Sequence, residues 1–265
     1  WDALTEKENV IYAEGFSSET DVYDEKLAAE AIEAAKQVDK AVVFAGLPES
    51  FESEGYDREH MQLPECQNRL IAEIAKVQPN TIVVLHNGAA VEMPWVQNIK
   101  GVVEAYLGGQ AVGQALVNIL YGIVNPSGKL AETLPIKLED NPSYLNFGDG
   151  EKVEYNEGVF VGYRYYDKKK MKVAFPFGHG LSYTTFEYSD FQIDKKKMSD
   201  KDTVEVSVKV KNTGNRAGKT VVQLYVEAPE TEVVRPVREL RGFEKISLEE
   251  GEEKTVTFTL DERAF

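Results

Sequence analysis

The sequence has little cysteine and little histidine, with one cysteine and three histidines among 265 residues. The single cysteine, Cys66, excludes a disulfide framework and argues against a cysteine metal site. The histidines are His60, His86 and His179, which lie far apart and lack the spacing of metal ligands. The sequence therefore predicts no metal site and no cofactor.

A long apolar run and an excess of positive charge are also missing. No segment reaches the roughly 18 consecutive apolar residues that a membrane helix requires, and no signal peptide opens the chain. The formal net charge is −15, whereas nucleic acids and anionic membranes bind basic surfaces. We therefore expect no nucleic-acid partner, no membrane partner and a cytoplasmic, bacterial location. The first residue is Trp1 rather than Met, so we expect a piece of a longer chain.

The first half of the sequence alternates apolar runs with helical patterns, and 42% of all residues are hydrophobic. Runs typical of buried strands occupy residues 41–46, 81–85 and 102–107, and residues 9–15 are a further candidate. Apolar residues at helical spacing separate these runs. The alternation predicts βαβ units, and hence an α/β fold whose mostly parallel sheet has helices on both faces, an α/β/α sandwich.

The pattern changes after about Pro126. The segment that follows is rich in aromatic residues and glycine, which is typical of a connection packed between domains. Farther on, apolar residues alternate with period two, as in Val204–Val210, which predicts an antiparallel β-sandwich. We predict an α/β domain over 1–135, a connecting segment over 136–186 and a β-sandwich over 187–265.

The stretch between the run 41–46 and the next helical pattern, residues 47–63, is unusually long and is called the acidic loop below. Strand-to-helix loops usually have about 2–6 residues, and this one has 17. A loop at the carboxyl end of a parallel strand lies where open α/β sheets bind ligands. It carries two aromatic residues and five carboxylates: Phe51, Tyr56, Glu49, Glu52, Glu54, Asp57 and Glu59. This composition indicates a carboxylate site with an aromatic wall, although an acidic loop can also be merely solvated.

Four motifs together resemble family 3 of the glycoside hydrolases, the β-glucosidase family. They are Glu52-Ser-Glu-Gly-Tyr-Asp-Arg58, Asn125-Pro-Ser-Gly-Lys-Leu130, Phe160-Val-Gly-Tyr-Arg-Tyr-Tyr166 and Phe177-Gly-His-Gly-Leu-Ser-Tyr-Thr184. The resemblance implies the α/β sandwich domain and a truncated fibronectin type III-like domain of such an enzyme. It also implies that the aspartate nucleophile lies on an N-terminal barrel domain that is not part of this chain.

The resemblance assigns the role of general acid/base to Glu54 in a retaining mechanism, with Glu52 as its main rival. Retaining enzymes use two carboxyl groups, and a neighbouring carboxylate helps the general acid to keep its proton. Gly55 would let the backbone turn sharply beside Glu54, and Asp57 with Arg58 would form an ion pair that shapes the loop. Phe51 and Tyr56 are candidates for substrate binding, by stacking on a sugar, but each could equally pack within the loop.

The implied activity is the hydrolysis of terminal non-reducing β-D-glucosyl residues from small β-glucosides or oligosaccharides. The implied partner is the barrel domain of the same enzyme, and a homo-oligomer with further copies of the chain stays open. The alternative is a non-catalytic α/β plus β-sandwich module that binds carbohydrate or protein through the same sheet edge.

Overall fold

The computed structural model describes residues 2–5, 9–148, 152–199, 201–229 and 232–265. The chain divides into two compact units, Trp1–Asn118 with Leu134–Asp140 and Ile119–Thr133 with Asn141–Phe265. In the described ranges, no helix combines the length and apolar character needed to cross a membrane. Within the same ranges, no group of three or more His, Cys, Asp or Glu side chains could hold a metal ion. The boundaries 1–135, 136–186 and 187–265 stay a prediction.

A parallel three-stranded sheet forms the centre of the first unit. Its strands are β1 (Ala41–Gly46), β2 (Thr81–His86) and β3 (Gly101–Glu104), in the order β1-β2-β3. The register pairs Gly46 with His86 and Leu85 with Glu104, so the three carboxyl ends lie along one edge. Val83, Val84 and Leu85 of the central strand are fully buried, as expected for a strand that is covered on both faces. The parallel sheet predicted from the apolar runs is confirmed.

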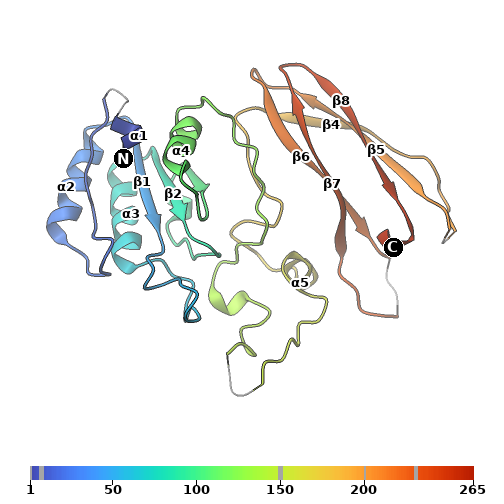
Figure 1. The fold of residues 1–265 in the computed structure, drawn as a ribbon, viewed down its shortest axis with the longest axis horizontal. Coiled ribbons are helices and arrows are strands. Elements are labelled where there is room, and N and C mark those ends of the chain that lie inside the picture. The colour runs from blue at the N-terminus through green and yellow to red at the C-terminus, as the bar shows by residue number, and fades with distance from the viewer. Residues whose placement is uncertain (1, 6–8, 149–151, 200, 230–231) are drawn as a thin grey trace. The chain divides into compact units, whose positions relative to one another are not determined.

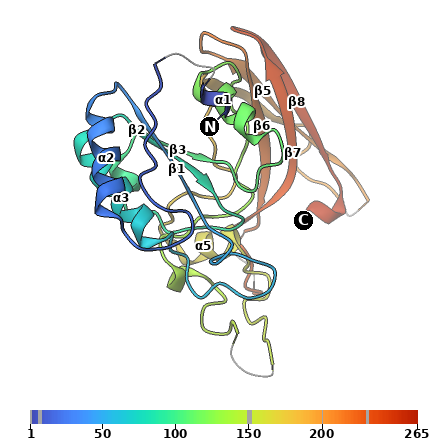
Figure 2. The same ribbon diagram turned by 60° about the vertical axis from the view of Figure 1, so that its left-hand side comes forward.

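Helices flank this sheet. They are α1 (Asp2–Thr5), α2 (Glu25–Lys36), α3 (Glu65–Val77) and α4 (Val112–Leu120), together with the short 3₁₀ turns η1 (Val96–Asn98) and η2 (Leu138–Asp140). The two views in Figures 1 and 2 show α2 and α3 on one side of the sheet and α4 on the other. Asp24 caps α2 by accepting hydrogen bonds from the backbone N–H groups of Lys26 and Leu27, which are otherwise unpaired at a helix start.

Two of the predicted strands differ from the structure. Residues 9–15 are not a strand, and Ile11 and Tyr12 are exposed. Apolar composition favoured a strand, but a strand also needs a hydrogen-bonded neighbour. The run 102–107 was predicted too long, because β3 ends at Glu104. Tyr106 has a φ of +49°, which turns the backbone out of the extended conformation.

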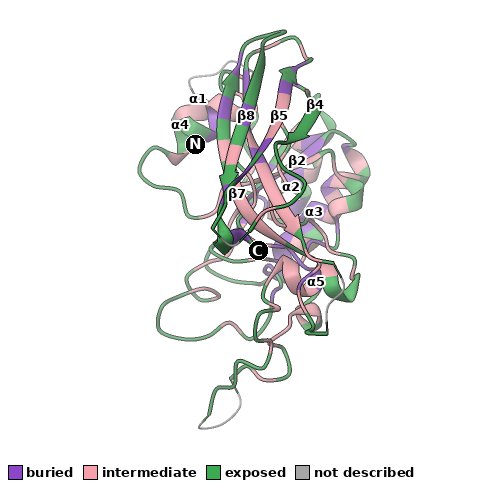
Figure 3. Ribbon diagram, turned by 90° about the vertical axis from the view of Figure 1, so that its right-hand side faces the viewer, coloured by how far each residue is buried: buried purple, intermediate pink, exposed green. Residues whose placement is uncertain are grey.

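The second unit contains two antiparallel sheets. One has the order β4 (Phe186–Ile193), β5 (Val204–Asn212), β8 (Glu253–Leu260), and the other pairs β6 (Gly218–Glu227) with β7 (Arg238–Leu248). Buried positions recur with more exposed ones between them along β5 and at the start of β6, whereas β4 is exposed over almost its whole length (Figure 3). The buried side chains of the central cluster are Val210, Val222, Ile246, Leu248 and Val256. The antiparallel β-structure predicted from period-two alternation is confirmed.

The helix α5 (Tyr163–Lys169) also belongs to the second unit, as does the short turn η3 (Glu262–Ala264). The Tyr163 ring stacks on Phe177 with a centroid distance of 4.9 Å, and its hydroxyl accepts a hydrogen bond of 2.8 Å from the backbone N–H of Leu240. Arg238 binds Asp167 at 2.8 Å. These contacts fasten the helix to β7, so the aromatic motif around Tyr163 has a packing role.

Candidate active site

Hydrogen bonds hold the start of the acidic loop at the end of β1. The buried Gln67 side chain of α3 accepts a hydrogen bond from the N–H of Gly46 and donates one to its carbonyl, both at 2.9 Å. The N–H of Leu47 donates to the carbonyl of His86 at 3.0 Å. A Cβ at Gly46 would lie 2.2 Å from that carbonyl oxygen, so the close approach of the two chains requires glycine.

The loop also ends at a fixed point. The carbonyl of Met61 accepts a hydrogen bond of 2.7 Å from the N–H of Glu92. The side chains of Met61 and Leu63 are 8% and 2% exposed. The start of the loop is thus bonded to the last residue of β2, and its end to the segment that follows β2, so the loop lies along the carboxyl edge of the sheet. The segment of residues 86–92 is called the rim turn below.

Glu54 lies at the tip of the acidic loop. An antiparallel bridge between Ser53 and Tyr56 closes a tight turn with Glu54 and Gly55 at its end, and all four residues are exposed. Among the residues that the structure describes, the Glu54 carboxylate has no hydrogen-bond or ion-pair partner. Gly55 does not adopt a positive φ, and a Cβ placed there would meet nothing within 4 Å. The tight turn beside Glu54 therefore forms without the left-handed backbone conformation that favours glycine.

Glu52, two residues before Glu54, has a different environment. Its Oε2 accepts a hydrogen bond of 2.6 Å from the N–H of Gly88, and its Oε1 lies 3.8 Å from Nη1 of Arg58. The ion pair of Arg58 recorded in the structure thus reaches Glu52, whereas the sequence suggested Asp57. Of the two rival carboxylates, Glu52 is engaged within its own unit and Glu54 is free in the described part of it.

The aromatic residues of the acidic loop also contact the loop itself. The Phe51 ring meets His60 edge-on, with centroids 5.5 Å apart. The hydroxyl of Tyr56 donates a hydrogen bond to the carbonyl of Glu49, and Tyr56 remains 48% exposed. Stacking of Phe51 or Tyr56 on a sugar stays a prediction, and Tyr56 has the more accessible ring.

Asn87 is a polar residue of this edge that the sequence reasoning missed. It is 1% exposed, and its Nδ2 donates to the carbonyl of Ala89 at 2.9 Å and to Oε2 of Glu104 at 3.4 Å. Its Oδ1 is buried and has no hydrogen-bond partner among the residues that the structure describes. The signal that could have found it is its position immediately after a buried strand, at the carboxyl edge of a parallel sheet.

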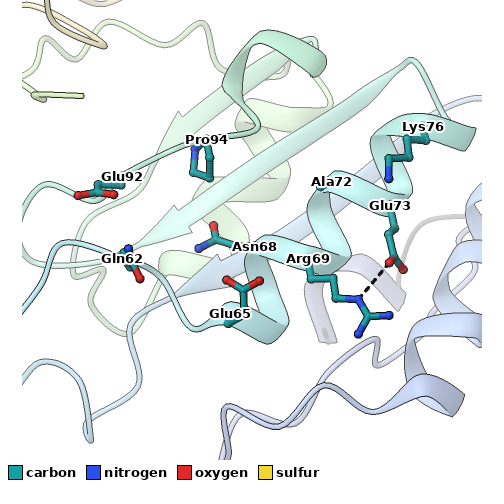
Figure 4. A pocket seen from close by; sticks show the side chains of 9 residues that line it. All are labelled: Gln62, Glu65, Asn68, Arg69, Ala72, Glu73, Lys76, Glu92 and Pro94. Atoms are coloured by element: carbon teal, nitrogen blue, oxygen red, sulfur yellow. Dashed lines mark hydrogen bonds and ion pairs between the residues drawn. The ribbon is translucent and has the colours of Figure 1, made fainter. Parts of the chain in front are cut away.

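A groove of about 370 Å³ lies beside α3 in the first unit, and it borders the acidic loop at Gln62 and the rim turn at Glu92 (Figure 4). Its lining residues are Gln62, Glu65, Asn68, Arg69, Ala72, Glu73, Lys76, Glu92 and Pro94. Its polar side chains are largely engaged: Arg69 binds Glu73 at 3.1 Å, and Asn68 accepts a 2.9 Å hydrogen bond from Trp95. Glu54 does not line it, and the geometry favours the acidic loop over this groove as the candidate active site.

The second and fourth family-like motifs contact each other within the second unit. Oδ1 of Asn125 accepts hydrogen bonds from Oγ of Ser182 and from the N–H of Tyr183, at 2.9 and 2.8 Å. Backbone pairs link Leu130 with Gly178 and His179, both at 2.8 Å. These hydrogen bonds engage polar groups of both motifs, and the paired motifs 125–130 and 177–184 are called the joint below.

Burial also shifts the pKa values of two side chains in this joint. Loss of solvent lowers the pKa of the Lys129 ammonium. Burial, and then the nearby charge of Lys129, lower the pKa of His179. The His179 ring also stacks on Phe175, with centroids 5.3 Å apart. These shifts stem from packing, so they mark a structural joint rather than a second active site.

The architecture defines a class of proteins: an α/β unit with an acidic loop at its sheet edge, followed by antiparallel β-sheets. The profile of the Glycosyl hydrolase family 3 C-terminal domain matches residues 3–183, and that of the Fibronectin type III-like domain matches residues 220–265. The chain belongs to glycoside hydrolase family 3, of which it contains the C-terminal part.

Individual relatives agree with this assignment. Thermostable β-glucosidase B of Acetivibrio thermocellus is 62% identical over 98% of this chain, which spans 35% of that protein. The crystal structure of a family 3 β-glucosidase of Bifidobacterium adolescentis superposes with a TM-score of 0.94 at 44% identity, over 100% of this chain and 39% of the other. The β-glucosidase of Kluyveromyces marxianus, solved in complex with glucose, has a TM-score of 0.84 at 49% identity, over 90% and 29%. The chain therefore spans about a third of the length of these relatives.

Proposed function

We propose that the chain is the C-terminal part of a retaining β-glucosidase, and that Glu54 is the general acid/base of that enzyme. The nucleophile is an aspartate of an N-terminal barrel domain in the complete protein. The substrates are small β-glucosides or oligosaccharides with a terminal non-reducing β-D-glucosyl residue. The names of the relatives, and the glucose complex of one of them, support this substrate class.

The observation that carries the proposal is the environment of Glu54. Its carboxylate is exposed at the tip of a loop that is bonded at both ends to the carboxyl edge of the sheet. A group that transfers protons to a substrate must be accessible and must be held in a defined place. Glu54 meets both requirements, whereas Glu52 has hydrogen-bond and ionic partners within its own unit.

In the first step of the mechanism, the aspartate attacks the anomeric carbon while Glu54 donates its proton to the glycosidic oxygen, and the aglycone leaves as an alcohol. In the second step, the Glu54 carboxylate removes a proton from water, which attacks the anomeric carbon and releases glucose and the free aspartate. Each turnover returns both carboxyl groups to their starting states.

The test uses the full-length enzyme with Glu54→Ala. We expect kcat/KM on an alkyl β-glucoside to fall about 10²- to 10⁴-fold, because a poor leaving group needs protonation. On dinitrophenyl β-glucoside, whose leaving group needs no acid, kcat/KM should change little, and added azide should raise kcat by replacing the base-activated water. The isolated chain should show no turnover.

Glu59→Ala is the matched control, since Glu59 is an exposed carboxylate of the same loop. It should retain activity on both substrates. Equal losses on both substrates in Glu54→Ala, or full activity of that variant, would refute the acid/base assignment and favour a non-catalytic binding module.

A further inference from the structure

The tip of the acidic loop is held from both sides. Glu52 precedes the tip and Arg58 follows it, and both side chains are largely buried, with 22% and 17% exposed. Each of them reaches the rim turn: Glu52 accepts a hydrogen bond from the N–H of Gly88, and Nη1 of Arg58 donates to the carbonyl of Ala90 at 3.3 Å. The residues between these two anchors are exposed, so the anchors determine where the tip lies.

The contact between Glu52 and Gly88 is unusually close. The distance of 2.6 Å from N to Oε2 is shorter than the roughly 2.7–3.2 Å that is usual for an N–H···O hydrogen bond. A Cβ on Gly88 would lie 3.1 Å from Oε1 and 3.2 Å from Oε2 of Glu52. The carboxylate therefore lies against the space that a side chain would need, and the rim turn provides a backbone donor at that point.

The two anchors, Glu52 and Arg58, also contact each other. The guanidinium of Arg58 lies 3.8 Å from Oε1 of Glu52 while it binds the carbonyl of Ala90. The pair is partly shielded from water, and partial burial strengthens attraction between opposite charges. One carboxylate thus binds both a backbone amide of the rim turn and the cation on the far side of the tip.

We propose that Glu52 is a positioning residue for catalysis, which holds the turn that carries Glu54 against the rim turn through Gly88 and Arg58. This inference rests on the proposed function, because it concerns the placement of the same general acid/base. Glu52 does not touch the reacting atoms. It acts through the backbone of residues 53–56, and a displacement of about 1 Å at a reacting group can cost about 100-fold in rate.

The experiment compares Glu52→Ala and Glu52→Gln in the full-length enzyme, with alkyl and dinitrophenyl β-glucosides as substrates. In Glu52→Ala, kcat/KM on the alkyl glucoside should fall about 10- to 100-fold, whereas first-step kcat/KM on the dinitrophenyl glucoside should stay within about threefold. Glu52→Gln keeps an oxygen acceptor for the N–H of Gly88 and should recover most of the loss. A merely structural role predicts equal losses on both substrates.

Two outcomes would overturn the inference. One is activity of Glu52→Ala on the alkyl glucoside equal to that of the control Glu59→Ala. The other is an equal loss of kcat/KM on both substrates in Glu52→Ala when the thermal unfolding of this variant is unchanged. The Glu54→Ala variant separates this inference from the proposed function: if it shows the leaving-group dependence and Glu52→Ala does not, only the positioning role fails. If Glu54→Ala lacks that dependence, the proposed function fails first.

Discussion

The acidic loop and the joint of the second unit are both built from motifs of the same family, but they differ in how their polar side chains are used. In the joint, Asn125 accepts two hydrogen bonds and donates a third, to the carbonyl of Ala217 at 3.0 Å. In the acidic loop, Glu52 is equally engaged, yet Glu54 has no partner in the described part of the chain. A motif alone does not identify the reactive group, and unused hydrogen-bonding capacity at a fixed, exposed position is the more informative sign.

The strongest test of this contrast compares two variants, one expected to lose activity and the other expected to lose stability. Glu54→Ala should remove most activity with little change in Tm, because the carboxylate is exposed and has no hydrogen-bond or ion-pair partner among the described residues. Asn125→Ala should do the reverse, lowering the free energy of unfolding by about 1–3 kcal/mol through lost hydrogen bonds, with kcat/KM within a fewfold of normal. Thermal unfolding and kinetics of the full-length variants measure both effects.

Asn215→Ala serves as the control for the asparagine, since Asn215 is exposed in the same unit. The comparison breaks down if Asn125→Ala loses activity selectively on the alkyl glucoside, because the joint would then take part in the chemistry.

A smaller effect is expected from Gly88→Ala. The new methyl group would lie within 3.2 Å of the Glu52 carboxylate, so the carboxylate must move by a few tenths of an ångström. We expect kcat/KM on the alkyl glucoside to fall about tenfold. Gly101→Ala is the control, because a Cβ there meets nothing within 4 Å. Identical kinetics of the two alanine variants would contradict the close contact.

The joint should also respond to pH. The pKa of His179 is lowered in the folded protein, so below the ordinary value of 6.5 the unfolded chain binds the proton more readily. The stability contribution is complete above about pH 6.5 and is lost as the pH falls through the window between that value and the lowered pKa. Replacing His179 by Gln should flatten the change of Tm between pH 7 and pH 5, by the order of 1–2 °C. A steeper change of Tm with pH in the variant would contradict the lowered pKa of His179.

The smallest effect is predicted for Gly55→Ala. The backbone does not need glycine here and the space is open, so the free energy of unfolding should change by less than about 0.5 kcal/mol. A large loss of activity with unchanged Tm would indicate that substrate or the barrel domain lies against this position in the complete enzyme. A clear drop in Tm would show instead that the turn depends on glycine.

Much of the fold could be predicted from the sequence because local patterns determine it. The apolar run 41–46 coincides with β1, and the valines of β5 alternate as expected. The strand β7 was not predicted, since its sequence mixes charged and apolar residues and Gly242 interrupts it. Its place depends on pairing with β6, which no local pattern encodes.

The candidate site was predictable only in part. The length and charge of the acidic loop pointed to the carboxyl edge of the parallel sheet, where the loop follows β1, and the resemblance pointed to Glu54. The partner of Arg58 was missed because sequence proximity favoured Asp57. The bond between Glu52 and Gly88 joins positions 36 residues apart, and it exists only because β1 and β2 run side by side in parallel.

The double hydrogen bond between Gln67 and Gly46 has a consequence for engineering. It ties the first turns of α3 to the last residue of β1, so the entrance of the loop is secured by a helix rather than by the loop's own residues. The N–H of Glu92 likewise holds the carbonyl of Met61, so the stretch between Gly46 and Met61 is fixed at both ends and can be replaced as one segment. Grafting the corresponding stretch of a relative between these two hydrogen-bonded points should alter the chemistry at the tip without changing the structure of the sheet.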